Sequence, residues 1–340
     1  MASVTPTPTK LGFIGAGIMG TSRIQRNGKE AIIRVDQSKE TKTLSSFVKL
    51  SFPDQTFPSH SPTQQLPGVP MALNLMKAGH ELMVWNRTSS ACQPLVDVGA
   101  TLASSAAEAC EKSEVTFVMV STPEAALACA EAAAPGLSKG KGYVDVSTVD
   151  AGTSSKISEL IKSTGAEFLE APVSGSKAPA EQGALIFMAA GDKSLYDKCV
   201  APLDTMGKAH FFLGDVGAGA KMKLIVNSVM GSMMASFAEG LSLTEAAQLD
   251  QDTLLQIISL GAINTPMYAL KGPNMIAGKY PPAFPLKHQQ KDMRLALALG
   301  DELAQEMPVA AAANEMYKTA RRMGKDDDDF SAVIAAIGRK

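Results

Sequence analysis

A glycine-rich turn after an apolar run near the start of the chain constrains the fold more than any other feature. The stretch "LGFIGAGIMG" (11–20) places Gly15, Gly17 and Gly20 in the pattern G-x-G-x-x-G. Glycines at this spacing allow a tight turn and let a pyrophosphate approach the backbone at a helix N-terminus. We therefore predict a dinucleotide-binding turn formed by Gly15, Gly17, Ile18, Met19 and Gly20.

The helix that should follow this turn begins only after 48 further residues. The stretch "VPMALNLMKAGH" (69–80) has the apolar spacing of a helix that ends near Gly79. Asn86, at the end of the next predicted strand, lies 66 positions after Gly20, or 18 once the 48 residues are set aside. A ribose-reading residue is expected about 20 positions after the turn. We therefore interpret residues 21–68 as an insertion into the first turn of the phosphate-binding helix.

The insertion has its own composition. It holds seven Ser, five Thr and four Pro, with seven Lys and Arg against four Asp and Glu, and it shows no sustained period. This composition predicts a mostly disordered loop. It is either a basic regulatory arm or, as we favour, a translated intron or gene-model error. Closing a flexible loop of this length costs only about 3 kcal/mol, so the fold should survive. Gly68 could replace Gly20, but we expect weaker cofactor binding.

Strands and helices alternate over the first part of the chain, whereas the remainder is helical in pattern. Predicted strands cover residues 11–16, 81–88, 114–122, 142–148, 167–173 and 184–191. Such alternation predicts a doubly wound parallel sheet. We therefore predict an α/β Rossmann domain (11–213) and an all-α domain (214–340), joined by a long interdomain helix.

The composition excludes several classes of partner and site. A net charge of −2 gives no reason to expect nucleic acid, and no apolar run reaches the roughly 18 residues that span a bilayer. The four cysteines form no CxxC pair and the four histidines are scattered, which favours free thiols and no metal site. The polar start "MASVTPTPTK" predicts a cytoplasmic protein. The four aspartates 326–329 read as a solvated turn.

The residues after the second long strand indicate which dinucleotide is bound. The sequence there is "WNRT", with Asn86, Arg87 and Thr88 where an acidic residue would bind a free ribose. An arginine at this position suits a 2′-phosphate, which predicts NADP rather than NAD. The alternative is a solvated arginine at a strand end.

Two polar motifs are candidates for the chemistry. Lys223 and Asn227, in "GAGAKMKLIVN", are four apart and share one helical face. A lysine in a dry cleft can donate a proton to a carbonyl that receives a hydride, although an isolated lysine is more often a snorkelling side chain. Ser174 and Gly175, in "APVSGSKAPAEQG", would offer donors to a carboxylate, or form only a small-residue loop. Lys291 and Asp292 would ordinarily be a solvated helix face.

These pieces in this order resemble the β-hydroxyacid dehydrogenase family, and within it the plant-type glyoxylate/succinic semialdehyde reductases. The resemblance rests on "GFIGAGIMG", "VDVSTVDA", "PVSGSKAPAE", "GAGAKMKLIVN" and "FPLKHQQKDMRLALALGDE", and it covers nearly all of residues 11–338 except the insertion. It implies NADPH-dependent reduction of a short aldehyde acid, glyoxylate or succinic semialdehyde, in a cleft between the two domains.

The resemblance also implies roles for individual residues. Lys223 would be the general acid, with Asn227 one turn further along holding it and the substrate. The other implied substrate contacts are Ser174, Gly175, Thr148, Phe284 and Asp292. The implied cofactor contacts, besides the glycine turn, are Asn86, Arg87, Thr88, Thr148 and Lys291.

Two other functions remain open at this point. A 3-hydroxyisobutyrate dehydrogenase shares the same skeleton. A scaffold without activity is the second alternative, because the family includes members that keep the fold but lack the lysine, and because the insertion splits the phosphate-binding helix. The small-residue-rich long helix favours a homo-oligomer.

Overall fold

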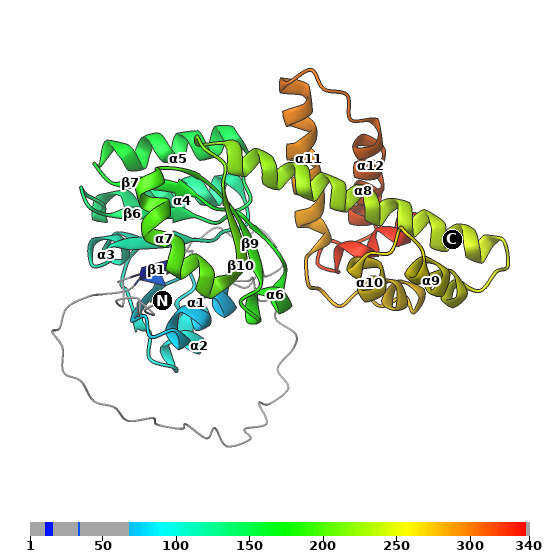
Figure 1. Ribbon diagram of the computed structural model, residues 1–340, viewed down its shortest axis with the longest axis horizontal. Helices are drawn as coiled ribbons and strands as arrows, with labels where there is room; N and C mark the ends of the chain where they lie inside the picture. Colours follow the sequence, from blue (N-terminus) through cyan, green and yellow to red (C-terminus); the bar gives the residue numbers. More distant parts are fainter. Residues whose placement is uncertain (1–10, 16–32, 35–67, 338–340) are drawn as a thin grey trace, which may run out of the picture.

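The computed structural model describes residues 11–15, 33–34 and 68–337. Gly17, Ile18, Met19 and Gly20 lie outside these residues, as does the predicted insertion apart from Ile33, Arg34 and Gly68. Within the described chain, a sheet flanked by helices is followed by a group of helices, and one long helix connects the two (Figure 1). This is the predicted α/β domain followed by an all-α domain.

The sheet contains ten strands among the described residues, in the order β10-β9-β7-β6-β5-β1-β3-β2, with β4 paired to β3 and β8 to β9. They are β1 (Leu11–Ile14), β2 (Ile33–Arg34), β3 (Leu82–Trp85), β4 (Thr101–Leu102), β5 (Val115–Val118), β6 (Gly142–Asp145), β7 (Glu167–Glu170), β8 (Val173–Ser174), β9 (Leu185–Gly191) and β10 (Gly207–Phe212). The strands from β4 through β3, β1, β5 and β6 to β7 run parallel. Their order reverses direction at β1, which is the topological switch point where doubly wound sheets bind ligands.

Helices cover the sheet in two groups, each with its own core. They are α1 (Gly68–Lys77), α2 (Gln93–Val96), α3 (Ala106–Glu111), α4 (Pro123–Ala133), α5 (Ala151–Ser163), α6 (Lys177–Glu181) and α7 (Lys193–Met206), with short 3-10 turns η1 (Ser89–Cys92) and η2 (Ala134–Gly136). Residues of α1 and α7 join one hydrophobic cluster, and residues of α3, α4 and α5 join the other. Both faces of the central strands are therefore buried, as parallel sheets require.

The second part of the chain is helical. It consists of α8 (Ala218–Ala246), α9 (Gln251–Leu260), α10 (Pro266–Ile276), α11 (Leu286–Glu302), α12 (Pro308–Arg322) and the 3-10 segment η3 (Phe330–Ala336). Helix α8 leaves the sheet domain and runs the length of the helical domain beside α11 and α12 (Figure 1). By length and apolar composition it could cross a membrane, yet half of its most apolar stretch is buried inside the protein. Its composition thus fits a connecting core helix.

Three features of the sheet differ from the sequence prediction. Strands β4 and β10 were not predicted, β9 pairs antiparallel with β7 and β8, and Ile33–Arg34 of the insertion pair antiparallel with β3. Strand β10 lies at the sheet edge and is mostly half-exposed, so its sequence "GKAHFF" lacks the apolar run of a buried parallel strand. The sheet is therefore parallel through its centre and mixed at both ends, where parallel pairs (β9 with β10, β3 with β4) stand beside antiparallel ones.

Candidate active site between the sheet and the helical domain

The first glycine of the turn has a conformation and a packing that only glycine permits. Gly15 follows β1 directly and has a φ of +112°. A Cβ added there would lie 1.5 Å from the carbonyl oxygen of Met119, just beyond β5. Because Gly15 has no side chain, the chain can turn close against β5. The space beyond the strand ends at the switch point then stays open to a ligand.

Helix α1 begins in contact with this glycine. A Cβ on Gly68, the first residue of α1, would lie 2.2 Å from the carbonyl oxygen of Gly15. Close packing of the helix start against the first strand is what the third glycine of the pattern provides. Pro70 in the first helical turn has no N–H to leave unpaired. These contacts fit a dinucleotide phosphate at the start of α1, with Gly68 in the position expected for Gly20.

The ribose-reading segment follows β3 at the same edge of the sheet. The side-chain Nδ2 of Asn86 donates to the carbonyl oxygen of Thr88 at 2.5 Å, and only 6% of Asn86 is exposed. This bond closes the turn and leaves Arg87 and Thr88 on the surface. Asn86 therefore shapes the turn, and Arg87 and Thr88 are the residues that a 2′-phosphate could reach.

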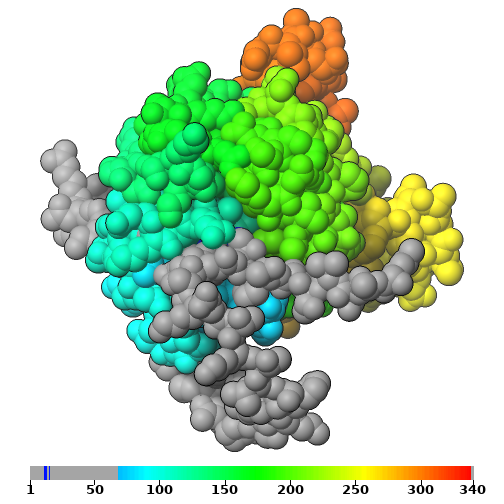
Figure 2. Space-filling view, turned by 60° about the vertical axis from the view of Figure 1, so that its left-hand side comes forward, coloured from blue at the N-terminus to red at the C-terminus, as the bar shows by residue number. Residues whose placement is uncertain are grey.

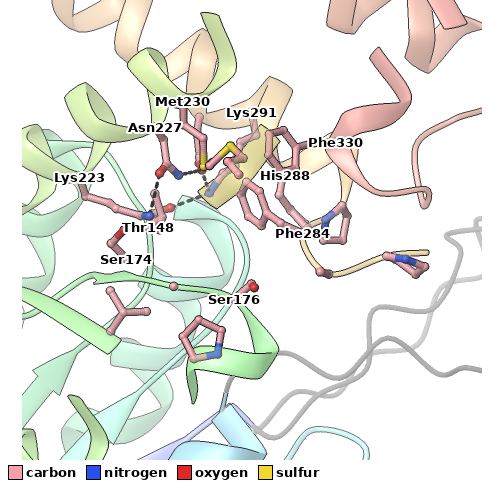
Figure 3. Close-up of a pocket in the computed structure, with 18 of the residues that line it drawn as sticks. Thr148, Ser174, Ser176, Lys223, Asn227, Met230, Phe284, His288, Lys291 and Phe330 are labelled. Atoms are coloured by element: carbon pink, nitrogen blue, oxygen red, sulfur yellow. Dashed lines mark hydrogen bonds and ion pairs between the residues drawn. The ribbon is translucent and has the colours of Figure 1, made fainter. Parts of the chain in front are cut away.

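A cleft of about 360 Å³ lies between the carboxyl ends of the strands and the helical domain. Such a volume is within the range of small-molecule sites. The sheet domain, α8 and α11 contribute its polar side chains, and α10, the loop before α11 and Phe330 contribute a more apolar side (Figure 3). The residues predicted from the sequence that line it are Thr148, Ser174, Gly175, Lys223, Asn227, Phe284, Lys291 and Asp292.

Lys223 is at one end of a continuous polar chain across this cleft. Its Nζ donates to Oδ1 of Asn227 at 2.8 Å, and Nδ2 of Asn227 donates to Oδ2 of Asp292 at 2.6 Å (Figure 3). Lys223 is 7% exposed, and Asn227 and Asp292 are 1% exposed. The spacing of four residues predicted from the sequence therefore places both polar groups on the buried face of α8, against α11.

Lys291 continues the chain back to the sheet domain. Its Nζ lies 3.0 Å from Oδ1 of Asp292 and donates to the carbonyl oxygens of Thr148, at 2.6 Å, and Ser121, at 3.1 Å. These two carbonyls follow β6 and β5. Lys291 thus connects α11 to two loops at the carboxyl ends of the strands, and the solvated-face interpretation of Lys291 and Asp292 was wrong.

Burial changes the acid strength of Lys223. Removal of its ammonium from water lowers the pKa to about 8 from 10.5, and Asp292 opposes the change while Lys291 adds to it. A lysine with a pKa near neutrality can hold its proton at physiological pH and also release it readily. This is the property that a general acid needs.

Glu170, which the sequence analysis did not single out, holds the start of the helix that carries Lys223. Its Oε1 accepts the backbone N–H groups of Gly217 at 2.9 Å, Gly219 at 2.7 Å and Ala220 at 3.1 Å. The Ser154 hydroxyl donates to the other oxygen, and Glu170 is 2% exposed. A buried carboxylate at a helix N-terminus accepts from backbone N–H groups that have no partner within the helix. Its negative charge also interacts favourably with the positive end of the helix dipole.

Replacing Glu170 with alanine should destabilise the protein by about 3 kcal/mol, because three buried N–H groups lose their acceptor. Chemical denaturation followed by circular dichroism measures this change. Glu167→Ala on the same strand is the matched control. Its carboxylate binds Lys198 and Ser194 at the surface, so the loss should stay below about 1 kcal/mol. Equal losses in the two variants would contradict the capping role of Glu170.

Two protein-family models match successive parts of the chain. Residues 67–214 match the NAD-binding domain of 6-phosphogluconate dehydrogenase, and residues 217–337 match the NAD-binding region of NADP-dependent 3-hydroxyisobutyrate dehydrogenase. The first match begins next to Gly68, where α1 starts. Among solved structures, a 3-hydroxyisobutyrate dehydrogenase from Salmonella typhimurium is 25% identical with a TM-score of 0.73, over 79% of this chain and 95% of that chain. The fold and the cleft thus define a dinucleotide-binding oxidoreductase of two domains.

Curated relatives identify the family. Glyoxylate/succinic semialdehyde reductase 2 (chloroplastic) of Arabidopsis thaliana is 59% identical over 273 residues, which are 79% of this chain and 76% of that protein. Reductase 1 of the same plant is 56% identical over 79% of this chain and 94% of its own length. The human cytokine-like nuclear factor N-PAC is 39% identical over 98% of this chain, which spans 52% of that protein. The chain belongs to the β-hydroxyacid dehydrogenase family, as its motifs indicated.

Proposed function

We propose that this protein reduces short aldehyde acids, glyoxylate to glycolate and succinic semialdehyde to 4-hydroxybutyrate, with NADPH as the electron donor. The observation that carries the proposal is the buried Lys223 ammonium in the cleft, held by Asn227 and linked to Asp292. The two Arabidopsis reductases, at 59% and 56% identity, support this substrate class. Arg87 and Thr88, exposed after β3, support NADPH over NADH.

When bound, NADPH supplies the hydride that reduces the aldehyde carbon. Lys223 donates its Nζ proton to the aldehyde oxygen as negative charge develops there, which stabilises the transition state more than the bound substrate. The Asn227 side chain fixes the direction of the Lys223 ammonium. Ser174 and Gly175 bind the substrate carboxylate through the hydroxyl and the backbone, and this orients the aldehyde towards Lys223.

The test measures NADPH consumption by the full chain with each member of a panel of substrates. We expect turnover with glyoxylate and succinic semialdehyde, and a lower KM for NADPH than for NADH. Oxidation of 3-hydroxyisobutyrate should be slower than either reduction, although the Salmonella typhimurium dehydrogenase has the same fold. Faster 3-hydroxyisobutyrate oxidation would favour the alternative dehydrogenase, and no turnover at all would favour a scaffold.

The pH dependence of kcat/KM should follow the Lys223 ammonium. The value of kcat/KM is highest while Lys223 is protonated, and it falls as the pH rises through the Lys223 pKa of about 8. The Asp292 carboxylate raises that pKa, so Asp292→Asn should move the alkaline limb to lower pH. Asp301→Asn, on the exposed face of the same helix, should leave the limb in place. An unchanged or upward shift in Asp292→Asn would contradict Lys223 as the titrating group.

We also propose that the chain forms a homo-oligomer through its helical domain. Exposed apolar side chains are concentrated there, on α8 and around α9, and the α9 segment (yellow) projects from the body in Figure 2. They include Ile225, Val229, Ile257, Leu260 and Ile263. Sedimentation should give a mass at least twice that of one chain, and a monomer at micromolar concentration would contradict the proposal.

The cytoplasmic location stays a prediction, since one relative is named chloroplastic, and imaging of the tagged protein would test it.

A further inference from the structure

Asp329, the last of four consecutive aspartates, is buried. The sequence suggested a solvated turn, but Asp329 is only 1% exposed, whereas the three aspartates before it are half-buried. Its Oδ1 accepts from the backbone N–H and the hydroxyl of Ser331, at 3.2 and 2.8 Å, and so begins the η3 segment. The solvated-turn prediction was therefore wrong for Asp329, which has a second carboxylate oxygen for other partners.

That second oxygen joins three segments of the helical domain. Oδ2 accepts from Nζ of Lys271 at 2.8 Å and from the backbone N–H groups of Ala283, at 3.1 Å, and Phe284, at 3.2 Å. Lys271 lies on α10 and is 8% exposed. Backbone bonds strengthen the connection, because Asp329 N–H donates to the Tyr280 carbonyl and Phe330 N–H to the Phe284 carbonyl. The loop of residues 279–285 is thereby bound to α10 and to η3.

This loop forms the wall of the cleft that faces Lys223. Ala283, Phe284, Phe330 and Lys271 all line the cleft, and the rings of Phe284 and Phe330 meet edge to face at 6.0 Å (Figure 3). Nζ of Lys271 lies over the Phe330 ring, 5.4 Å from its centre, so the ion pair is next to this edge-to-face pair. A shift of the Asp329 carboxylate would therefore move the cleft wall.

The energetics of buried ion pairs favour a positioning role over a stabilising one. Desolvation of both charges offsets most of their attraction, so a buried pair contributes little net stability compared with apolar residues. Removal of one partner leaves the other charge buried and unpaired, which is unfavourable. The geometry of the pair, with two further backbone N–H groups on the same oxygen, is what distinguishes it from the surface ion pairs of this domain.

We propose that the Lys271–Asp329 ion pair is a positioning pair that fixes the Ala283–Phe284 wall and so sets the size of the substrate end of the cleft. The proposal rests on the proposed function in that Phe284 contacts the aldehyde acid. Lys271 and Asp329 do not touch the reacting atoms. Both act through the loop that carries Phe284.

The test uses Asp329→Asn, Lys271→Met and the double variant in the full chain. Each single variant leaves one buried charge unpaired, whereas the double variant removes both. Asp328→Asn is the matched control, because this neighbouring aspartate forms a half-exposed ion pair with Lys325. The measurements are amide hydrogen exchange of residues 279–286, the KM for succinic semialdehyde and glyoxylate, kcat, and NADPH binding.

We expect faster exchange at residues 279–286 and a KM for the aldehyde acid raised about tenfold in each single variant, with kcat and the NADPH dissociation constant little changed. The double variant should recover part of both effects, and Asp328→Asn should match the wild type. If one single variant fails to fold, the other and the double variant still give the answer. Unchanged exchange and KM in folded variants, or a fall in kcat at unchanged KM, would overturn the proposal.

The exchange measurement separates this inference from the proposed function. If the wild-type chain reduces no aldehyde acid while the variants loosen residues 279–286, the function is wrong and the positioning of the wall stands. If the wild-type chain is active and the variants alter neither exchange nor KM, the function stands and the positioning pair is wrong.

Discussion

Replacing Lys223 with alanine should reduce kcat/KM for glyoxylate by about 10² to 10⁴, the usual contribution of a general acid. Without the ammonium, only water can protonate the alkoxide that forms in the cleft. NADPH should still bind, because its phosphates are expected at the contact of Gly15 with Gly68 at the start of α1, whereas Lys223 belongs to another helix, α8. Steady-state kinetics give the first quantity, and fluorescence titration of NADPH gives the second.

The control for this change is Lys221→Ala, two residues earlier on the same helix. Lys221 is half-exposed and does not line the cleft, so both rate and binding should match the wild type. Turnover retained in Lys223→Ala would exclude the proton-donor role. Lost NADPH binding in that variant would instead mean that the substitution disturbs the domain arrangement.

A chain that lacks residues 21–68 should bind NADPH more tightly than the full chain, by about tenfold or more. Gly20 would then precede Val69 directly and take the place of Gly68 against Gly15, where any larger residue would collide with the backbone. Only four residues would then separate Gly15 from Gly20, so the N–H groups of the turn would be held in place by a short connection. In the full chain the connection is long, and closing a flexible loop of that length costs up to about 3 kcal/mol. Fluorescence titration of both chains compares the dissociation constants.

The outcome also decides between the two explanations of the insertion. If only the shortened chain binds NADPH and reduces glyoxylate, residues 21–68 inactivate the protein, as expected for a translated intron or gene-model error. Equal dissociation constants would mean that the insertion is tolerated, and that the start of α1 at Gly68 is sufficient for the phosphate site.

Local sequence signals were enough to predict the cofactor domain and the central residues of the cleft. The apolar run that ends at Gly15 predicted the first strand of the doubly wound sheet, and the spacing of Lys223 and Asn227 predicted that both share one buried helix face. Each of these features depends on residues within one or two helical turns of each other. The positions of Ser174, Thr148, Phe284 and Asp292 followed from family resemblance, and the structure places all of them around the cleft.

The supporting residues could not be predicted because their partners are distant in the sequence. Glu170 caps a helix that begins 48 positions later, and Asp329 contacts N–H groups 45 and 46 positions earlier. An acidic residue at the end of "EFLE" or in "DDDD" gives no local sign of burial. Strand β10 was missed for a related reason, since an edge strand is recognised by its pairing with β9 and not by its own apolar pattern.

The most direct test of the central claim follows the hydride itself. The full chain is incubated with NADPH that carries deuterium at the transferable position of its nicotinamide, together with glyoxylate or succinic semialdehyde. Mass spectrometry of the products should find glycolate or 4-hydroxybutyrate with one carbon-bound deuterium per NADPH consumed. Products without deuterium, or NADPH bound with no alcohol formed, would contradict an NADPH-dependent aldehyde-acid reductase.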